Sequence, residues 1–333
     1  MKAPLLEVRG LTVSFRTEEG EIVAVDDLYF SVGRGETLVI VGESGSGKSA
    51  ASLAVMGLID APGKVRCEAI DFSDKSGRKR DLSRLAEAEM QRIRGAEIAM
   101  IFQEPMTSLN PVYTIGEQII EAITFHEPMS GRAARGRAEE MLALLGVPDP
   151  RRRLDAYPHQ LSGGMRQRAM IGMALCCRPS LLIADEPTTA LDVTVQAQIL
   201  ELIRGLQREL GMAVIFITHN LGVAAEIADR IMVMYAGQAV ESGPCRAIFR
   251  GTHLPYTIGL MRSVPRLGLD RSAAPLPAIP GNMPDPRRLP RGCRFHPRCS
   301  FAEPGLCDLQ APPLESCGDN HQVRCLRWRE VRA

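Results

Sequence analysis

The sequence predicts an α/β fold, and two observations support this prediction. Short apolar segments that favour β-strands, at 37–40, 97–102, 181–185 and 213–218, are separated by stretches with helical patterns. The first of these segments leads into a glycine-rich loop at 42–49, and the loop leads into a helix-forming sequence. A strand, a glycine-rich loop and a helix in this order are typical of a phosphate-binding site.

The glycine-rich loop matches the pattern G-x-x-x-x-G-K-[ST] at Gly42, Gly47, Lys48 and Ser49. Glycines let the backbone turn so that several N–H groups point at one anion, and the following helix adds its positive N-terminal end. We expect Lys48 to bind the β- and γ-phosphates and Ser49 to offer its hydroxyl to Mg²⁺. Phe15, upstream of the loop, is either a strand core residue or a ring stacked on adenine. The predicted nucleotide-binding residues are Phe15, Gly42, Glu43, Ser44, Gly45, Ser46, Gly47, Lys48, Ser49 and Ala50.

Length and composition narrow the class of protein. The chain has 333 residues, enough for one large domain with additions or for two domains. Its net charge of +1 gives no general attraction to nucleic acid or anionic lipid. Its apolar runs are shorter than the roughly 18 residues that a membrane span needs, and the first residues lack a signal-peptide core. We therefore expect a cytosolic protein, whose nine cysteines do not form a disulfide framework.

Other segments give a coarse map of the elements. Residues 5–40 predict several strands, 50–59, 82–94 and 195–210 predict helices, and 60–80 predict turns. The helical pattern of 114–145 breaks at Pro128, and 231–235 with 238–241 predict a hairpin about Ala236-Gly237. After residue 249 the composition changes, because 12 of the 23 prolines lie between Pro255 and Pro313. We expect an irregular segment there.

Four further motifs follow the glycine-rich loop. Gln103 comes after a predicted strand, the carboxylates Asp185 and Glu186 follow another, and His219 follows a third. Each alone is compatible with a structural role: a strand-end Gln or His, or a solvated acidic turn. The fourth is the sequence Leu161-Ser162-Gly163-Gly164-Met165-Arg166-Gln167, which precedes a helical stretch.

In this order the motifs resemble the ATP-binding cassette (ABC) family, and the resemblance covers residues 5–249. It implies a RecA-like P-loop NTPase core with an N-terminal antiparallel β subdomain, and an α-helical subdomain inserted at about 104–175. The expected domains are an ABC nucleotide-binding domain at 1–249 and an irregular, Cys-rich C-terminal extension at 250–333. One departure is Asn220, where the family usually has Asp after the histidine.

The resemblance also implies residue roles in ATP hydrolysis. Glu186 would be the general base, His219 would contact the γ-phosphate, and Gln103 would orient water or bind Mg²⁺. Lys48 acts with them, and Ser49, Gln103 and Asp185 would be the Mg²⁺ ligands. The signature residues would contact ATP on a second subunit, with Asp192 at the dimer seam. These signature residues are Leu161, Ser162, Gly163, Gly164, Met165 and Gln167.

A finer resemblance is to the ATPases of dipeptide and oligopeptide importers, a subgroup that includes nickel importers. It rests on 101–111, 157–168, 253–257 and 292–299. It implies a second ABC ATPase subunit, identical or homologous, two transmembrane permease subunits and an extracytoplasmic peptide-binding protein as partners, but no nucleic acid. The location would be peripheral, on the cytoplasmic face of the cell (inner) membrane. Alternatives are transport of nickel or another small solute, a soluble cassette ATPase acting on nucleic acid or ribosomes, and a non-catalytic interaction subunit.

Five cysteines lie in the extension. Gaps of 5, 7 and 17 residues separate Cys293, Cys299, Cys307 and Cys325, which is wider than in the usual zinc pairs or the bacterial ferredoxin run. Four thiolates suit zinc or an iron–sulfur cluster, and free thiols are a third possibility. The importer resemblance favours a [4Fe-4S] cluster on these four, with Arg294 and Arg298 offsetting its charge and Cys317 spare. The other four, Cys67, Cys176, Cys177 and Cys245, are expected to pack as small residues.

Overall fold

The computed structural model describes residues 3–103, 108–188, 192–264, 278–318 and 320–331. The chain forms two compact units, each built from separate stretches of sequence. The first contains the chain up to Leu5, Val32–Glu36 and Phe72–Phe216, and the second contains Leu6–Ser31, Thr37–Asp71 and the chain from Ile217 onward. The glycine-rich loop and the Cys-rich extension therefore belong to the same unit.

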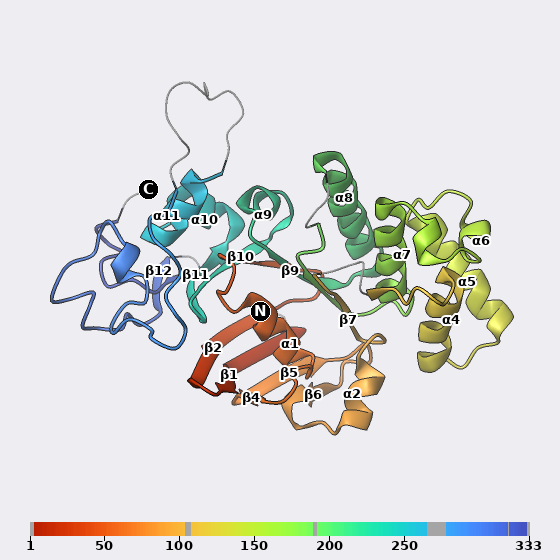
Figure 1. Ribbon diagram of the computed structural model, residues 1–333, viewed down its shortest axis with the longest axis horizontal. Coiled ribbons are helices and arrows are strands. Elements are labelled where there is room, and N and C mark those ends of the chain that lie inside the picture. The colour runs from red at the N-terminus through yellow and green to blue at the C-terminus, as the bar shows by residue number, and fades with distance from the viewer. Residues whose placement is uncertain (1–2, 104–107, 189–191, 265–277, 319, 332–333) are drawn as a thin grey trace. The chain divides into compact units, whose positions relative to one another are not determined.

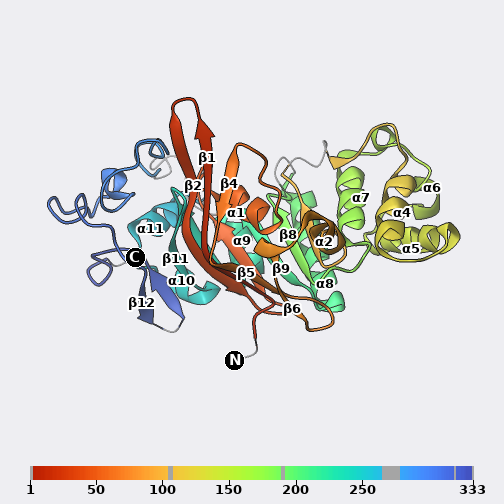
Figure 2. The same cartoon turned by 90° about the horizontal axis from the view of Figure 1, so that it is seen from below.

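The second unit begins with a long β-hairpin (Figure 2). Strands β1 (Leu6–Thr17) and β2 (Gly20–Val32) neighbour each other in the sheet, and β1 also pairs antiparallel with β4 (Gly63–Arg66). Strand β5 (Ala69–Ser73) lies beside β1 on its other side. The predicted turns in 60–80 lie between three short strands that the sequence did not indicate, namely β4, β5 and β6 (Lys79–Asp81). These strands are three to five residues long, too short to show a clear alternation.

A second sheet of this unit holds the glycine-rich loop. All five residues of β3 (Thr37–Val41) are buried, and β3 runs parallel to β10 (Arg230–Tyr235). Strand β10 turns into the antiparallel β11 (Gln238–Pro244) through Ala236 and Gly237, which both have positive φ. Two positive φ values are typical of a tight hairpin turn, so the predicted hairpin is confirmed.

The extension adds two strands to this sheet. Strand β13 (His321–Val323) pairs antiparallel with β11, and β12 (Glu315–Gly318) pairs with β13. The expected irregularity of the extension therefore holds for only part of it. The buried carboxylate of Glu241, on β11, accepts hydrogen bonds from Thr252 at 2.6 Å and from the backbone N–H of His253 at 3.1 Å, and pairs with His321 Nε2 at 2.9 Å. Backbone pairing to an open strand edge needs no sequence pattern, which is why composition did not reveal it.

The second unit also contains several short helices. They are α1 (Lys48–Val55), α9 (Leu221–Ile227), α10 (Cys245–Gly251), α11 (Pro255–Arg262) and the short 3₁₀ helix η3 (His296–Arg298). Of these, α9, α10 and α11 lie near one another in Figure 1. Helix α1 begins at Lys48, two residues earlier than predicted, because Gly47 with φ of 100° ends the loop directly at the helix. The backbone N–H groups of its first turn therefore face the loop.

The first unit combines parallel strands with helices. Strand β7 (Ile98–Ile101) runs parallel to β8 (Leu181–Asp185), whose five residues are all buried, and β9 (Ala213–Thr218) is the next strand. The predicted helix at 82–94 is instead a 3₁₀ turn η1 (Leu82–Arg84) followed by α2 (Glu87–Ile93). Asp81 caps the 3₁₀ turn by accepting the backbone N–H of Ser83, which separates it from α2.

Most helices of the first unit lie together, as Figure 1 shows for α4 to α7. Helices α4 (Ile115–His126) and α5 (Gly131–Leu144) confirm the break at Pro128, and Thr114 and Ser130 cap them. Short turns α6 (Pro150–Arg153) and η2 (Pro158–Gln160) lead to α7 (Gly163–Leu175), and α8 (Val193–Leu210) follows β8. Over the described residues, every helix falls short of the length and apolar character required to cross a membrane.

Candidate nucleotide site and cysteine cavity

The glycine-rich loop is held in place by backbone groups on two sides. A Cβ added at Gly42 would lie 2.3 Å from the carbonyl oxygen of Met234, and one at Gly47 would lie 2.3 Å from that of Ala24. Such approaches are open only to glycine. The backbone N–H of Gly237 also donates to the carbonyl of Ser46 at 3.0 Å. The loop therefore has a fixed shape, set by β2 and by the turn between β10 and β11.

Lys48 lies within the curve of the loop. Its Nζ donates to the carbonyls of Gly42 at 2.8 Å and Glu43 at 2.9 Å, and the residue is 5% exposed. Ser44 and Gly45 are exposed at the tip, whereas Ser46 is fully buried. The loop thus has a solvent-exposed tip and an ammonium bound against its backbone, an arrangement that suits an anion of several charges.

Phe15 lies in the same unit as the loop, on β1. Its register partner is Gly63 on β4, and a Cβ at Gly63 would lie 2.8 Å from the Phe15 ring. The ring is half-buried. It is therefore packed on one side against β4, and its predicted stacking on adenine stays a prediction.

The predicted general base Glu186 and the predicted Mg²⁺ ligand Asp185 lie in the first unit. Asp185 is the last residue of β8 and is 3% exposed, and Gln103 follows the neighbouring parallel strand β7. Because the carboxyl ends of parallel strands meet at one edge of a sheet, Gln103, Asp185 and Glu186 lie at the same edge. Glu186 has φ of 47°, a left-handed conformation that is uncommon for a side chain of this size. Such strain often marks a functional position.

The signature sequence caps a helix in the same unit. Ser162 is the N-cap of α7, and its Oγ accepts the backbone N–H of Met165 at 3.4 Å. Ser162 and Gly163 are exposed, so the N-terminus of α7 is accessible to an anion. Gln167 is 2% exposed, and its side-chain amide donates to the carbonyl of Pro187. This bond joins the signature helix to the turn that carries Glu186, a connection that the sequence did not reveal.

Asp192, His219 and Asn220 lie at element ends. Asp192 is exposed and caps α8 by accepting the N–H of Val195 at 3.0 Å. His219 follows β9 and is exposed, in the second unit. Asn220 caps α9 by accepting the N–H of Gly222 at 2.8 Å, which is a role that Asp performs equally well. The departure from the expected Asp therefore keeps the helix cap.

The predicted residues fall into two groups. The second unit contains Phe15, the loop from Gly42 to Ala50, His219 and the four extension cysteines, and the first contains Gln103, Asp185, Glu186, Asp192 and the signature. Ser49, one predicted Mg²⁺ ligand, is therefore in a different unit from Gln103 and Asp185. Residues 104–107 and 189–191, which belong to the quoted motifs, lie outside the described residues.

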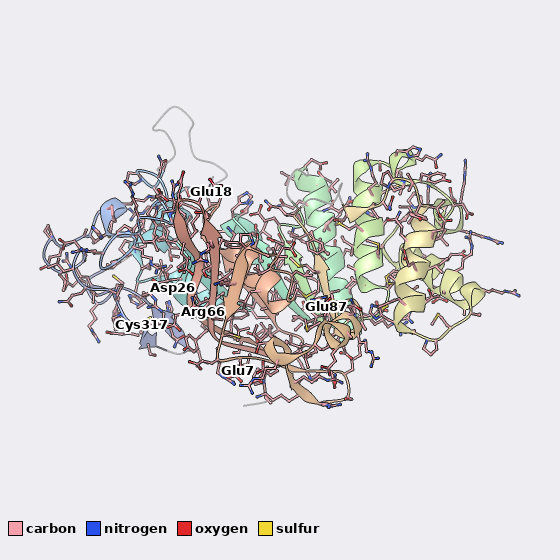
Figure 3. The ribbon with its side chains drawn as sticks, turned by 60° about the horizontal axis from the view of Figure 1, so that its bottom comes forward. Glu7, Glu18, Asp26, Arg66, Glu87 and Cys317 are labelled. Atoms are coloured by element: carbon pink, nitrogen blue, oxygen red, sulfur yellow. The ribbon has the colours of Figure 1, made fainter. Side chains whose placement is uncertain are left out.

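Four cysteines of the extension line one small cavity of about 40 Å³. They are Cys293, Cys299, Cys307 and Cys325, while Cys317 on β12 (labelled in Figure 3) is not among the lining residues. The backbone N–H of Cys293 donates to the carbonyl of Cys307 at 2.9 Å, which joins two of the cysteine segments. The wide gaps in the sequence are thus closed in space.

The environment of these thiols is apolar. Aromatic rings of Tyr235, Tyr256, Phe295 and Phe301 line the same cavity. Burial raises the pKa of Cys325 to about 12, and it also raises the pKa values of Cys293 and Cys299. Thiols in such surroundings stay protonated unless a cationic centre displaces the proton. In the parts of the chain that the structure describes, no three His, Cys, Asp or Glu side chains are grouped to bind a single metal ion.

Two arginines between Cys293 and Cys299 have carboxylate partners that do not line the cavity. Arg298 forms a bidentate pair with Glu43 of the glycine-rich loop, with N–O distances of 2.7 and 3.0 Å. Arg294 pairs with Asp26 on β2 and donates to the carbonyl of Ala236; of these residues, Asp26 is labelled in Figure 3. Both guanidinium groups were expected to offset the charge of a cluster, but the structure gives each a carboxylate partner. In the sequence, the only sign of these two contacts was that basic residues lie between two cysteines.

The chain is similar to known proteins over nearly its whole length. A family model described as ABC transporter matches residues 25–189, and one described as the C-terminal region of oligopeptide/dipeptide transporters matches 240–307. A putative peptide import ATP-binding protein of Brucella melitensis is 54% identical over 100% of this chain and 99% of its own length. The dipeptide transport ATP-binding protein DppD of Escherichia coli is 51% identical over 96% of each chain.

Solved structures show the same likeness. A dimeric bacterial ABC transporter cassette has a TM-score of 0.61 at 30% identity, covering 72% of this chain and 99% of its own. The same cassette in a post-hydrolysis state bound to ADP and Pi gives the same TM-score, identity and coverage. The ordered motifs, the α/β strands that carry them and these matches lead to one conclusion. This chain belongs to the ABC transporter family, as an ATPase subunit that carries the C-terminal region found in oligopeptide and dipeptide transporters.

Proposed function

We propose that this chain is the ATP-hydrolysing subunit of a membrane importer for dipeptides or oligopeptides. Its support is the combination of a pre-shaped phosphate-binding loop with a C-terminal region of the oligopeptide/dipeptide type in one chain. ATP binding would close a dimer of two such subunits, the closure would drive the permease, and hydrolysis would reset it. We assign ATP binding to residues 1–249, with the inserted helices at about 104–175, and a transporter-specific role to 250–333.

The proposed chemistry uses residues of both units. Lys48 would leave the carbonyls of Gly42 and Glu43 to contact the β- and γ-phosphates. Ser49, Gln103 and Asp185 would hold Mg²⁺, which supplies charge compensation to the phosphates. Glu186 would accept the proton of the attacking water, a role that typically contributes about 10²–10⁴-fold in rate.

The remaining roles concern closure. His219 would contact the γ-phosphate, and the exposed end of α7 at Ser162 would contact ATP bound to the other subunit. Asp192 would lie at the seam between the subunits. Support for a two-subunit arrangement comes from the related cassette, whose solved structure is a dimer.

The proposed partners are a second ABC ATPase subunit, two transmembrane permease subunits and an extracytoplasmic peptide-binding protein. The location would be peripheral, on the cytoplasmic face of the cell membrane. The experiment is reconstitution of the complex in vesicles with the binding protein outside the ATPase compartment. ATP turnover that rises when a dipeptide or oligopeptide is added supports the proposal. If ATP turnover rises with Ni²⁺ but with no peptide, the transported substrate is nickel and the peptide assignment is wrong.

We also propose that Cys293, Cys299, Cys307 and Cys325 hold a [4Fe-4S] cluster. A zinc ion draws four ligands to about 2.0–2.3 Å from one point, whereas a cubane keeps its four cysteine sulfurs apart around a larger core. Four thiols that line one cavity offer the number of sulfur ligands that such a cubane needs. In addition, the backbone N–H of Glu303 lies 3.5 Å from Cys307 Sγ, a contact that stabilises a thiolate.

The cluster is tested by metal content. Anaerobically purified protein should be brown and contain about four irons per chain, as a Cys₄-ligated cubane requires. The Ser variants of Cys293, Cys299, Cys307 and Cys325 should lose the iron, and Cys317→Ser is the matched control that should keep it. Colourless protein with about one zinc per chain would replace the cluster by a zinc site, and protein with neither metal would leave free thiols.

A further inference from the structure

We propose that the segment from Cys293 to Cys299 positions the phosphate-binding loop. A change in the cysteine cavity, such as the loss of one thiol that lines it, would then alter the affinity for ATP. Arg298 is the positioning residue of this link. The inference rests on the proposed binding of ATP at the loop, and it adds a regulatory input to that site. It is carried by contacts within the second unit alone.

The first contact is the pair between Arg298 and Glu43. The Arg298 side chain is 5% exposed, and Nη1 and Nη2 each donate to one carboxylate oxygen of Glu43. Its Nε donates to the carbonyl of Pro280 at 2.9 Å. A buried guanidinium with bidentate geometry holds its partner in one orientation, more tightly than an exposed pair does.

Glu43 transmits this orientation to the loop. Its backbone N–H donates to the hydroxyl of Tyr256 at 3.0 Å, and its carbonyl accepts the ammonium of Lys48 at 2.9 Å. The carboxylate of Glu43 thus contacts Arg298 of the extension, its N–H contacts Tyr256 of α11, and its carbonyl contacts Lys48. A shift of Glu43 would change the position from which Lys48 reaches a phosphate.

The residues that hold Glu43 line the cysteine cavity or lie next to a residue that does. Cys299 follows Arg298 directly, and Tyr235, Tyr256 and Phe295 lie on the cavity wall. The rings of Tyr235 and Tyr256 are 4.7 Å apart between centroids, and each is 5.2 Å from Phe295. Because closely packed rings have little free volume, a change in the cavity displaces the residues that hold Glu43.

A second contact acts at the other side of the loop. Arg294 donates to the carbonyl of Ala236 and pairs with Asp26. The next residue, Gly237, donates its N–H to Ser46 of the loop at 3.0 Å and accepts the N–H of Asp26 at 2.9 Å. The two arginines between the cavity cysteines therefore support the loop from both sides.

The first experiment measures equilibrium binding of an ATP analogue with a fluorescent ribose label. Arg298→Ala should weaken binding by about 5- to 20-fold, the lower part of the usual range of coupling between sites. Arg298→Lys should recover part of this loss because it keeps the charge but not the fork. The control is Arg287→Ala, which removes an exposed pair between the extension and Glu19 and should bind like the wild type.

Glu43→Gln tests the same link without altering the extension. It should weaken binding, and the double variant with Arg298→Ala should be no weaker than the more affected single variant. It also keeps the test available if Arg298→Ala fails to fold. Wild-type affinity in either single variant, or fully additive losses in the double variant, would overturn the positioning role. Absence of binding by the wild type would instead overturn the proposed nucleotide site.

The second experiment addresses the cavity. Cys299→Ser, purified anaerobically, should bind the analogue as weakly as Arg298→Ala, and combining the two should add no further loss. Cys317→Ser lies outside the cavity lining and should keep the wild-type affinity. Wild-type affinity in Cys299→Ser, or an equal loss in Cys317→Ser, would overturn the link between the cavity and the loop.

Discussion

Replacement of Gly47 by alanine tests the shape of the phosphate-binding loop directly. Gly47 has φ of 100°, and its added Cβ would lie 2.3 Å from the carbonyl oxygen of Ala24 and 3.4 Å from the Cα of Gly237. Both neighbours are backbone atoms of strands and turns, which cannot rotate away as a side chain would. Gly47→Ala must therefore shift the loop or β2.

The expected cost has two parts. A side chain at this φ costs about 1–3 kcal/mol of backbone strain. Forcing a methyl group into a filled space costs about 1–3 kcal/mol more. The free energy of unfolding should therefore fall by about 2–6 kcal/mol.

Substitutions at two other glycines separate the backbone strain from the cost of the steric clash. Gly45 has φ of 80° but no atom within 4 Å of its added Cβ, so Gly45→Ala should cost only the strain, about 1–3 kcal/mol. Gly205 lies inside α8 with open space around it, so Gly205→Ala should stabilise by about 0.5–1 kcal/mol. The assay is urea unfolding without nucleotide, followed by circular dichroism. Equal losses for Gly45→Ala and Gly47→Ala would refute the argument from close approach.

Three further variants test other parts of the molecule. Glu186→Gln should lower ATP turnover by at least about 10²-fold while ATP binding persists, since the amide cannot accept a proton; near-normal turnover would remove Glu186 from its role. Ser162→Arg should keep ATP binding to this chain and suppress turnover, because the signature serves the other subunit; full activity of isolated wild-type monomers would contradict this. Burial raises the pKa of Asp74, but hydrogen bonds from Ser76 and Arg78 outweigh it and lower the pKa overall. A carboxylate whose pKa is lowered by folding stabilises the fold at pH values above its ordinary pKa, and this contribution is lost as the pH falls through the pKa of the folded state. Asp74→Ala should therefore lower the free energy of unfolding by about 2–3 kcal/mol at pH 7 and by little in acid. Urea titrations at both pH values would show this difference.

The sequence by itself determined the local elements of the site. The loop from Gly42 to Ser49, the strand before it and the helix after it are contiguous, so their pattern already contains the turn, the anion-binding N–H groups and the lysine. The hairpin about Ala236-Gly237 and the break at Pro128 were predictable for the same reason. In each case the cause is the backbone preference of one or two residues, which acts within a few positions of the chain.

Only the tertiary structure decided how distant segments meet. Arg298 and Glu43 are 255 positions apart, and nothing in either segment specifies the other as its partner. The four cysteines, spread over an irregular segment, line one cavity only because β12 and β13 pair onto β11 and bring the end of the chain back. Strand pairing and ion pairing depend on which segments meet in space, and neither produces a periodic pattern of residues in the sequence. For that reason the support of the loop by the extension could not be read from the sequence.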